Sequence, residues 1–372
     1  MSLQERWERT LSQLREQGRF RRLQAPAGID FASNDYLGYG GGRAVALPPS
    51  TLSTSGAASR LLRGNHPIWD EVEAQLARWH GTEAALVFTS GYSANEGLLS
   101  TIIGPRDWVA SDRLNHACIG DGLRLAGVKP FKFKHNDLNH LEEGLRAAAA
   151  KRKTEQELFI VTETLFSMDG DSPDLAGLNG LAERYGAHLI LDEAHATGCY
   201  GERGTGLTES RRTSCGGRLF ATMHTGGKAL GVPGAYIVGS QKLKDWLVNR
   251  CRHFIFTTAL PPAVGEWWLA MLDRVAGDVE GRAKLQANCE RFRDCLQSPR
   301  SSIHSPIVPI ILGDDAKATV AAERLQSKGF DVRAVRPPTV PESTARLRIS
   351  IHADHSLEQI EALASAIREV MA

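Results

Sequence analysis

Between residues 67 and 238, short apolar segments alternate with segments of helical periodicity, and this alternation limits the possible folds more than any other feature. The segments 84–88, 158–163 and 189–192 are short and mainly apolar, as strands buried on both faces are. Strands that alternate with helices in this way predict a mainly parallel, doubly wound sheet. The other expected strands lie at 108–111, 130–133, 219–224 and 235–238, and the expected helices at 67–80, 92–103, 137–152 and 175–185.

The pattern changes after Pro261-Pro262, where a second and smaller α/β unit with an antiparallel component is expected. Its expected elements are a helical region at 263–297, a strand at 306–312, a helix at 315–328, strand segments near 330–335 and 345–351, and a helix at 356–371. Residues 3–22 have the apolar spacing of an amphipathic helix. We therefore predict an N-terminal helix and arm (1–50), a large domain (51–265) and a small C-terminal α/β domain (266–372).

Charge and hydropathy argue against several classes of partner. Lys and Arg number 44 against 43 Asp and Glu, so the net charge of +1 gives no indication of nucleic-acid binding. No apolar run approaches the roughly 20 residues of a membrane-spanning helix, and the polar first residues are unlike a signal peptide. The six cysteines are scattered without C-x-x-C or metal-ligand spacing, which predicts reduced thiols, no metal site and a cytoplasmic protein.

A carboxylate, an imidazole and an amine follow one another in an order typical of pyridoxal-phosphate enzymes. Asp192 and His195 come directly after an apolar strand, at the end of a parallel sheet where ligands bind. Asp192 can hold the proton on the ring nitrogen of the cofactor, and Lys228, flanked by glycines, can form a Schiff base with its aldehyde. The alternative is a buried strand that ends in a solvated acidic pair, with an unrelated surface lysine.

Further groups could complete a pyridoxal-phosphate site. His116 follows an expected strand and can lie flat on the cofactor ring. The backbone N–H groups of Gly91 and Tyr92, at the start of a helix, can bind the phosphate. The remaining candidates are Thr225 and the pair Thr257-Thr258 as further phosphate donors, and Ser167 and His195 as partners of the phenolic oxygen.

Two other enzyme classes fit the motifs poorly. Gly91–Asn95 reads G-x-S-x-N and lacks the second glycine of the nucleophile elbow of serine hydrolases. The glycines of Gly201–Gly206 do not have the spacing of the dinucleotide-binding G-x-G-x-x-G motif. A binding module without catalytic activity stays open as an alternative.

Six motifs in this order resemble the α-oxoamine synthases over nearly the whole chain: Phe31–Gly38, Ser59–His66, Phe88–Asn95, Phe166–Asp171, Asp192–His195 and Thr225–Gly231. The resemblance implies a fold-type I pyridoxal-phosphate-dependent transferase that condenses an amino acid with an acyl thioester. It assigns catalytic roles to Lys228, His116, Asp192 and His195. The family often has a bulky residue at position 226, so the packing around Gly226 is expected to differ.

The segment Arg336–Pro341 is most similar to family members that use L-alanine and a pimeloyl thioester, carried by coenzyme A or acyl carrier protein. By this resemblance Arg336 binds the amino-acid carboxylate, Thr339 and His116 contact substrate, and Arg21 binds the acyl substrate. The resemblance also implies a homodimer in which Thr257-Thr258 reaches the phosphate of the neighbouring subunit. The alternative within the family is a member that uses glycine.

Overall fold

The computed structural model describes residues 1–46, 49–209, 218–297 and 305–371, and its internal contacts divide the chain into two units. The larger unit comprises Leu37–Phe166 and Asp171–Ala283. The smaller unit comprises Met1–Tyr36, Ser167–Gly170 and Lys284–Ala372. This division differs from the predicted domains, because the N-terminal arm pairs with a C-terminal strand through Ile29 and Phe330. The predicted three-part division itself stays a prediction.

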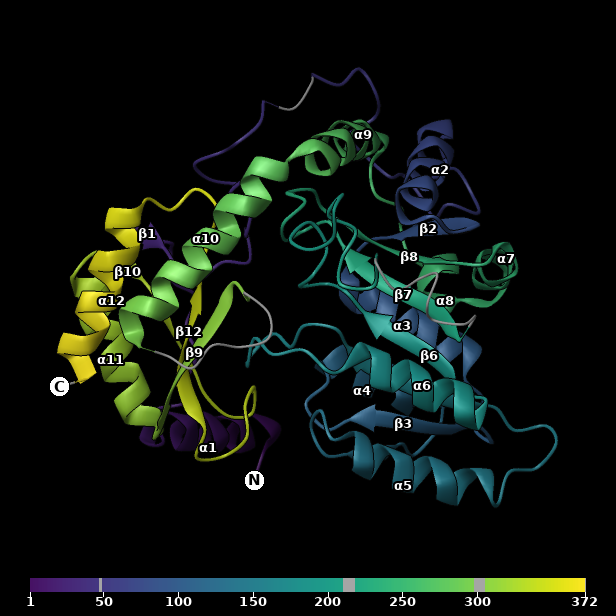
Figure 1. The fold of residues 1–372 in the computed structure, drawn as a ribbon, viewed down its shortest axis with the longest axis horizontal. Helices are drawn as coiled ribbons and strands as arrows, with labels where there is room; N and C mark the ends of the chain where they lie inside the picture. The colour runs from purple at the N-terminus through teal and green to yellow at the C-terminus, as the bar shows by residue number, and fades with distance from the viewer. Residues whose placement is uncertain (47–48, 210–217, 298–304, 372) are drawn as a thin grey trace. The chain divides into compact units, whose positions relative to one another are not determined.

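A seven-stranded sheet forms the centre of the larger unit (Figure 1). Its strand order is β2-β8-β7-β6-β5-β3-β4. Within it, β8 pairs antiparallel with both neighbours, whereas the other described pairs are parallel. The strands are β2 (Ala84–Phe88), β3 (Trp108–Asp112), β4 (Phe131–Phe133), β5 (Leu158–Glu163), β6 (His188–Asp192), β7 (Leu219–Thr225) and β8 (Ala235–Gly239). A mainly parallel central sheet is what the alternating pattern predicts.

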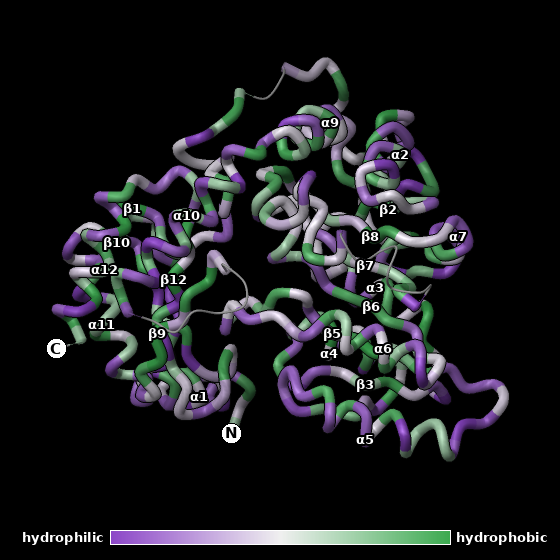
Figure 2. Tube along the Cα trace, viewed as in Figure 1, coloured by the Kyte–Doolittle hydropathy of each residue, from purple (hydrophilic) through white to green (hydrophobic). Residues whose placement is uncertain are grey.

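Helices cover both faces of this sheet. They are α2 (Pro67–His80), α3 (Gly91–Ile102), α4 (Ala117–Leu125), α5 (Leu138–Ala149), α6 (Leu175–Tyr185), α7 (Gln241–Arg250), α8 (Arg252–Ile255) and α9 (Pro262–Gly277). Phe159 and Val161 of β5 lie in the core with α3, α4 and α7, whereas Leu158 and Ile160 lie in the core with α5 and α6. Successive side chains of a strand point to opposite faces, so a strand between two helical layers buries both sets of side chains. In Figure 2 green, hydrophobic segments lie among these strands, with white and purple segments between them.

The smaller unit contains a three-stranded antiparallel sheet of order β11-β12-β9 and a two-stranded parallel ladder of β1 and β10. Its strands are β1 (Ile29–Asp30), β9 (Ile307–Gly313), β10 (Phe330–Asp331), β11 (Arg333–Val335) and β12 (Ala345–Ser350). The remaining helices of the chain are α1 (Leu3–Glu16), α10 (Val279–Leu296), α11 (Asp315–Ser327) and α12 (Leu357–Met371). The predicted antiparallel component is therefore present.

Several element boundaries differ from the prediction for local reasons. The first helix ends at Glu16 rather than near residue 22, because Gly18 adopts a positive φ of 66°. The helical region at 263–297 is interrupted at Asp278, where the backbone leaves helical geometry. The helices α4, α7 and α8 were not predicted, since their sequences are short, glycine-containing or strongly charged.

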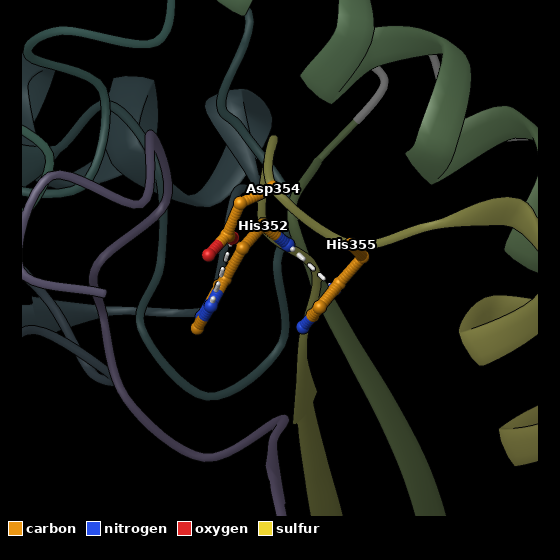
Figure 3. Close-up of side chains that lie close together, drawn as sticks. All are labelled: His352, Asp354 and His355. Atoms are coloured by element: carbon orange, nitrogen blue, oxygen red, sulfur yellow. Dashed lines mark hydrogen bonds and ion pairs between the residues drawn. The ribbon is translucent and has the colours of Figure 1, made fainter. Parts of the chain in front are cut away.

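His352, Asp354 and His355 cluster directly after β12, and the cluster ties the N-terminal arm to the rest of the smaller unit (Figure 3). His355 Nε2 donates to the carbonyl of Asp30 at 2.7 Å, and its Nδ1 accepts from the backbone N–H of His352 at 3.1 Å. The two imidazole rings are stacked with an interplanar angle of 11°. Metal-binding lone pairs lie in the ring planes, so two nearly parallel rings cannot direct them to one ion. We therefore interpret the cluster as a structural contact that holds the N-terminal arm in the smaller unit.

Among the helices of the described residues, none combines the length and the apolarity that a membrane crossing requires. Cys118, Cys251 and Cys289 are buried free thiols, and Cys295 is a partly exposed one. Cys215 lies outside the described residues.

His135 links the ends of two segments of the larger unit. Its Nδ1 lies 3.0 Å from Asp112 Oδ1 and its Nε2 lies 2.8 Å from Asp171 Oδ2. Burial disfavours the imidazolium ion, but hydrogen bonds to Asp112 and Asp171 outweigh burial and raise the pKa of His135 to about 10. The imidazolium of His135 therefore holds Asp171, which ends the Phe166–Asp171 motif, against the carboxyl end of β3.

We expect His135→Gln to destabilise the protein at about pH 7 and to lose this effect above about pH 10. A histidine with a raised folded-state pKa contributes its full stabilisation below its unfolded-state pKa of about 6.5 and loses it as the pH rises through the folded value. Urea unfolding of the wild type and the variant at several pH values measures the difference. A difference that does not change with pH would contradict the charged form of His135.

Candidate active site

A cavity of about 210 Å³ opens at the carboxyl end of the central sheet. Its wall combines the residues that follow β2 and β3 with those that end β5, β6 and β7. The carboxyl ends of parallel strands meet at one edge of a sheet, so residues far apart in the sequence converge there. The lining residues are Gly91, Tyr92, His116, Cys118, Glu163, Asp192, Ala194, His195, Met223, Thr225 and Lys228. Seven of the predicted site residues are among them.

Asp192 is buried, with 7% of its surface exposed, and two neutral donors hold its carboxylate. Asn95 Nδ2 donates to one oxygen at 2.7 Å, and the backbone N–H of Ala194 donates to the other at 2.8 Å. Hydrogen bonds to the charged form favour that form. The carboxylate is therefore prepared to hold a proton on a bound ring nitrogen. Asn95 lies on α3 and was not predicted as a site residue.

Lys228 and His195 lie together, with Lys228 Nζ 2.8 Å from His195 Nε2. The backbone before the lysine passes close to α9. A Cβ atom on Gly226 would lie 2.5 Å from the Trp268 ring and 2.5 Å from the Val232 carbonyl oxygen. Trp268 and Val232 occupy the space that a side chain at position 226 would need. The expected difference from the packing of the family stays a prediction.

His116 stands at the cavity wall and caps the first turn of α4. Its ring Nδ1 accepts from the backbone N–H of Cys118 at 3.2 Å and lies 2.9 Å from Cys118 Sγ. An Nδ1 that accepts leaves the proton on Nε2. Burial lowers the pKa of His116, and the charge of Lys228 lowers it further, against the opposing effect of Asp192. A neutral imidazole can lie against an aromatic ring and can still donate from Nε2.

The start of α3 presents unsatisfied backbone donors to the cavity. The first N–H groups of a helix have no acceptor within the helix, and the Ser90 side chain accepts only that of Ser93. Gly91 and Tyr92 line the cavity, and Gly91 lies near Thr225 of β7. A phosphate group fits this combination of N–H groups, helix dipole and hydroxyl.

Glu163 is the main cavity residue that the sequence analysis missed. It ends β5, is only 2% exposed and accepts from the backbone N–H of His116 at 2.6 Å. Burial raises the pKa of Glu163 to about 8, and the charge of Asp192 contributes to the rise. An acid at the end of an apolar strand was the available signal, since Asp192 was identified by the same feature.

Three predicted cofactor residues are not among those that line this cavity. Thr257 and Thr258 line a separate small hollow of the larger unit, together with Arg60 and Trp69. Ser167 belongs to the smaller unit, where its carbonyl accepts from Arg348 Nε at 2.6 Å. Their predicted contacts with the cofactor stay predictions.

The predicted substrate residues Arg21, Arg336 and Thr339 come together in the smaller unit. They line one hollow of about 870 Å³, next to the turn after α1. Arg21 Nη2 donates to Thr339 Oγ1 at 3.1 Å, and Arg336 donates to the carbonyl of Gly18. Neither arginine has a carboxylate partner among the described residues, so the hollow can bind an anion.

Arg348 is a second candidate for binding an anion, and the sequence analysis did not select it. It is 7% exposed and donates to neutral oxygens only: Ser167 O, Ser350 Oγ, Asn34 Oδ1 and Tyr36 Oη. Arg346 on the same strand instead forms an ion pair with Asp169 at 2.7 Å. A buried guanidinium without a counter-charge is costly, so a bound carboxylate at Arg348 would be stabilised.

Comparisons with known proteins agree with this geometry. A family model described as aminotransferase class I and II matches residues 26–367. The 8-amino-7-oxononanoate synthase of Chlorobaculum parvum is 44% identical over 354 residues, which cover 92% of this chain and 89% of that protein. The synthase of the same name from Anaeromyxobacter dehalogenans is 41% identical over 350 residues, covering 92% and 86%. This chain belongs to the class I and II aminotransferase family.

Solved structures support the same relationship. A serine palmitoyltransferase of S. paucimobilis, with PLP and myriocin bound, matches with a TM-score of 0.87 and 26% identity. The match covers 100% of this chain and 98% of that one. The 8-amino-7-oxononanoate synthase of Francisella tularensis matches with a TM-score of 0.75 and 27% identity over 92% of this chain and 98% of that one. The predicted family relationship, the fold-type I architecture and the enzyme class are thereby confirmed.

Proposed function

We propose that this chain is an 8-amino-7-oxononanoate synthase of biotin biosynthesis. It condenses L-alanine with a pimeloyl thioester, releases carbon dioxide and the free thiol carrier, and forms 8-amino-7-oxononanoate. The names of relatives with up to 44% identity support the reaction. The observation that carries the proposal is the cavity in which Asp192, His195, His116 and Lys228 converge, because a decarboxylative condensation needs these groups around one cofactor.

The cofactor is pyridoxal phosphate, which supplies an electron sink for the carbanion formed at the α-carbon of the amino acid. The residues of the cavity fit it. Asp192, held by Asn95 and Ala194, is prepared to bind the ring nitrogen as an anion. The N–H groups at the start of α3 and the Thr225 hydroxyl would bind the phosphate, and His195 the phenolic oxygen. His116 would lie against the ring.

Lys228 would hold the cofactor and would also act on the substrate. Its amine, when neutral, would take the α-proton of the amino acid, because Nζ lies in the cavity close to His195. His116 keeps its Nε2 proton available for the acyl carbonyl oxygen, because Nδ1 accepts from Cys118. Both acts need a cavity wall that holds these side chains in one orientation.

Arg336 and Thr339 are proposed to bind substrate from the hollow of the smaller unit, and Arg21 the acyl substrate. Arg348 is the alternative to Arg336 for binding the amino-acid carboxylate, since it is buried and has no acidic partner in the described part of the chain. The acyl group is carried by coenzyme A or by acyl carrier protein.

The second candidate function is a related synthase that uses glycine, such as 2-amino-3-ketobutyrate ligase, which would share the cavity residues.

We further propose a homodimer with shared active sites in the cytoplasm. The apolar side chains of α1 are exposed, with Trp7 58% and Leu3 51% accessible, so a second subunit would bury surface there. Thr257 and Thr258 lie outside the cavity lined by Lys228, as is expected if they serve the phosphate of the neighbouring subunit. The free thiols of Cys118, Cys251, Cys289 and Cys295 are consistent with a reducing compartment.

The first test of the function concerns Lys228. Borohydride reduction of the holoprotein followed by peptide mapping should place the phosphopyridoxyl label on Lys228. The variant Lys228→Ala should keep its circular dichroism spectrum and lose turnover of alanine with pimeloyl-CoA. The control Lys242→Ala changes an exposed lysine of α7 and should leave both label and turnover unchanged. A label on another lysine would refute the assignment.

The second test concerns the amino acid. Alanine should be preferred to glycine by about 10- to 200-fold in kcat/KM, because one methyl group in an apolar pocket contributes about 1–3 kcal/mol. If Arg336 binds the carboxylate, Arg336→Ala should raise the KM for alanine by about 10- to 100-fold, the effect of a lost charged hydrogen bond. Arg333→Ala is the matched control, since Arg333 is already paired with Asp331. The same rise in Arg348→Lys, with none in Arg336→Ala, would transfer the role to Arg348.

The third test concerns the shared site. Two inactive variants, Lys228→Ala and the double variant Thr257→Ala/Thr258→Ala, should regain part of the activity when mixed. A hybrid dimer would contain one site with neither defect. Subunit exchange is verified with differently tagged chains. Exchange without recovered activity would contradict the proposed sharing.

A further inference from the structure

Glu163 and Asp192 form a pair of buried acids in the wall of the cavity. They end the neighbouring parallel strands β5 and β6 and are direct partners in the register. Their exposed fractions are 2% and 7%, and neighbouring strands lie about 4.8 Å apart. Two acids on neighbouring strands that are almost fully buried cannot both keep a negative charge at low cost.

The hydrogen-bond partners of the two acids are unequal. Asp192 receives one donor on each oxygen, from Asn95 and from the backbone of Ala194. Glu163 receives one donor, the backbone N–H of His116, on Oε1. Donors stabilise a carboxylate anion, so the negative charge of the pair belongs on Asp192.

The other charged and titratable neighbours of Glu163 support this distribution. Asp112 of β3 adds a further negative charge, and the positive charge of Lys228 opposes it only in part, since burial and Asp192 dominate. His116 and Cys118, at the start of α4, also face the pair, and burial keeps both in their neutral forms. These neighbours together leave the pKa of Glu163 raised to about 8.

We propose that Glu163 carries a proton at neutral pH and is a positioning residue of the active site, which holds His116 through its backbone while Asp192 alone bears the negative charge. The His116 N–H donates to the carbonyl oxygen of the protonated acid, and the backbone of the N-cap residue of α4 is thereby fixed. The ring of His116 is held separately by the backbone of Cys118. Both the main chain and the imidazole of His116 therefore have a defined position.

Loss of the proton above about pH 8 should impair the site. A second buried anion favours the protonated form of the Lys228 amine, which must be neutral to take the α-proton. This effect on turnover rests on the proposed function, whereas the protonation of Glu163 does not.

The decisive measurement is a titration of the apoprotein by NMR. The backbone amide of His116 should shift with a midpoint near pH 8 in the wild type, because its acceptor changes charge. In Glu163→Gln the shift should be absent, although the amide oxygen still accepts the hydrogen bond. The control Glu157→Gln, an exposed acid just before β5, should titrate like the wild type. An unchanged midpoint in Glu163→Gln, or no shift in the wild type, would overturn the proposal.

Activity and stability supply independent readouts. In kcat/KM, Glu163→Gln should lose the decline that the wild type shows above about pH 8. Glu163→Leu, which cannot accept from His116, should fall below Glu163→Gln at every pH. An acid with a raised folded-state pKa makes stability fall from about pH 4.5 to about pH 8. Glu163→Gln should therefore gain stability over the wild type across this range, and a constant difference would contradict the assignment.

Absence of any product would reject the proposed function alone, since the titration and unfolding need no substrate.

Discussion

The parallel pairing of β5, β6 and β7 is the constraint on which the active site depends. Their registers bring Glu163 beside Asp192 and Asp192 beside Met223. The runs Leu158–Val161 and Leu189–Leu191 are apolar and buried, whereas β7 also buries Thr222 and His224, which contact each other. The acids of β5 and β6 lie at the carboxyl edge, where the chain leaves the sheet and the cavity opens. A shift of one residue in the register would send these acids to the opposite face of the sheet.

Electrostatic balance then decides what the cavity can do. The cavity has two acids, two histidines and a lysine in its wall. Asn95 and the backbone of Ala194 stabilise one anion, and burial disfavours the second. One stable anion beside an amine and the imidazole of His116, whose pKa burial lowers, suits a cationic cofactor ring and a base that must lose its proton. The reactivity of the cavity depends on which ionisable side chains stay neutral as much as on which side chains are present.

In the smaller unit, the arginines differ in whether an acidic side chain lies beside them. Arg346 and Arg348 lie on the same face of β12 and are both buried, but only Arg346 has an acid beside it. Arg21 and Arg336 occupy a more exposed hollow and are held by a hydroxyl and a carbonyl. No described residue gives Arg21, Arg336 or Arg348 an acidic partner, which supports the proposal that this unit binds carboxylate substrates.

The order of apolar strands and helices in the sequence was enough to predict the central sheet. Short motifs were enough to select Lys228, Asp192, His195 and His116, which line one cavity. Both predictions succeed because strand periodicity and strand ends are local properties of a sequence. Only the tertiary structure determined which other residues surround these site residues. Asn95 lies 97 residues before Asp192 in the sequence. Burial and the charge of Asp192 together raise the pKa of Glu163. A side chain at position 226 would meet both the Trp268 ring and the Val232 carbonyl. The sequence alone also does not distinguish Arg346 from Arg348, whereas the structure pairs Arg346 with Asp169 and gives Arg348 neutral acceptors. Burial and long-range contacts set pKa values and the pairing of charges, and neither quantity exists until the chain has folded.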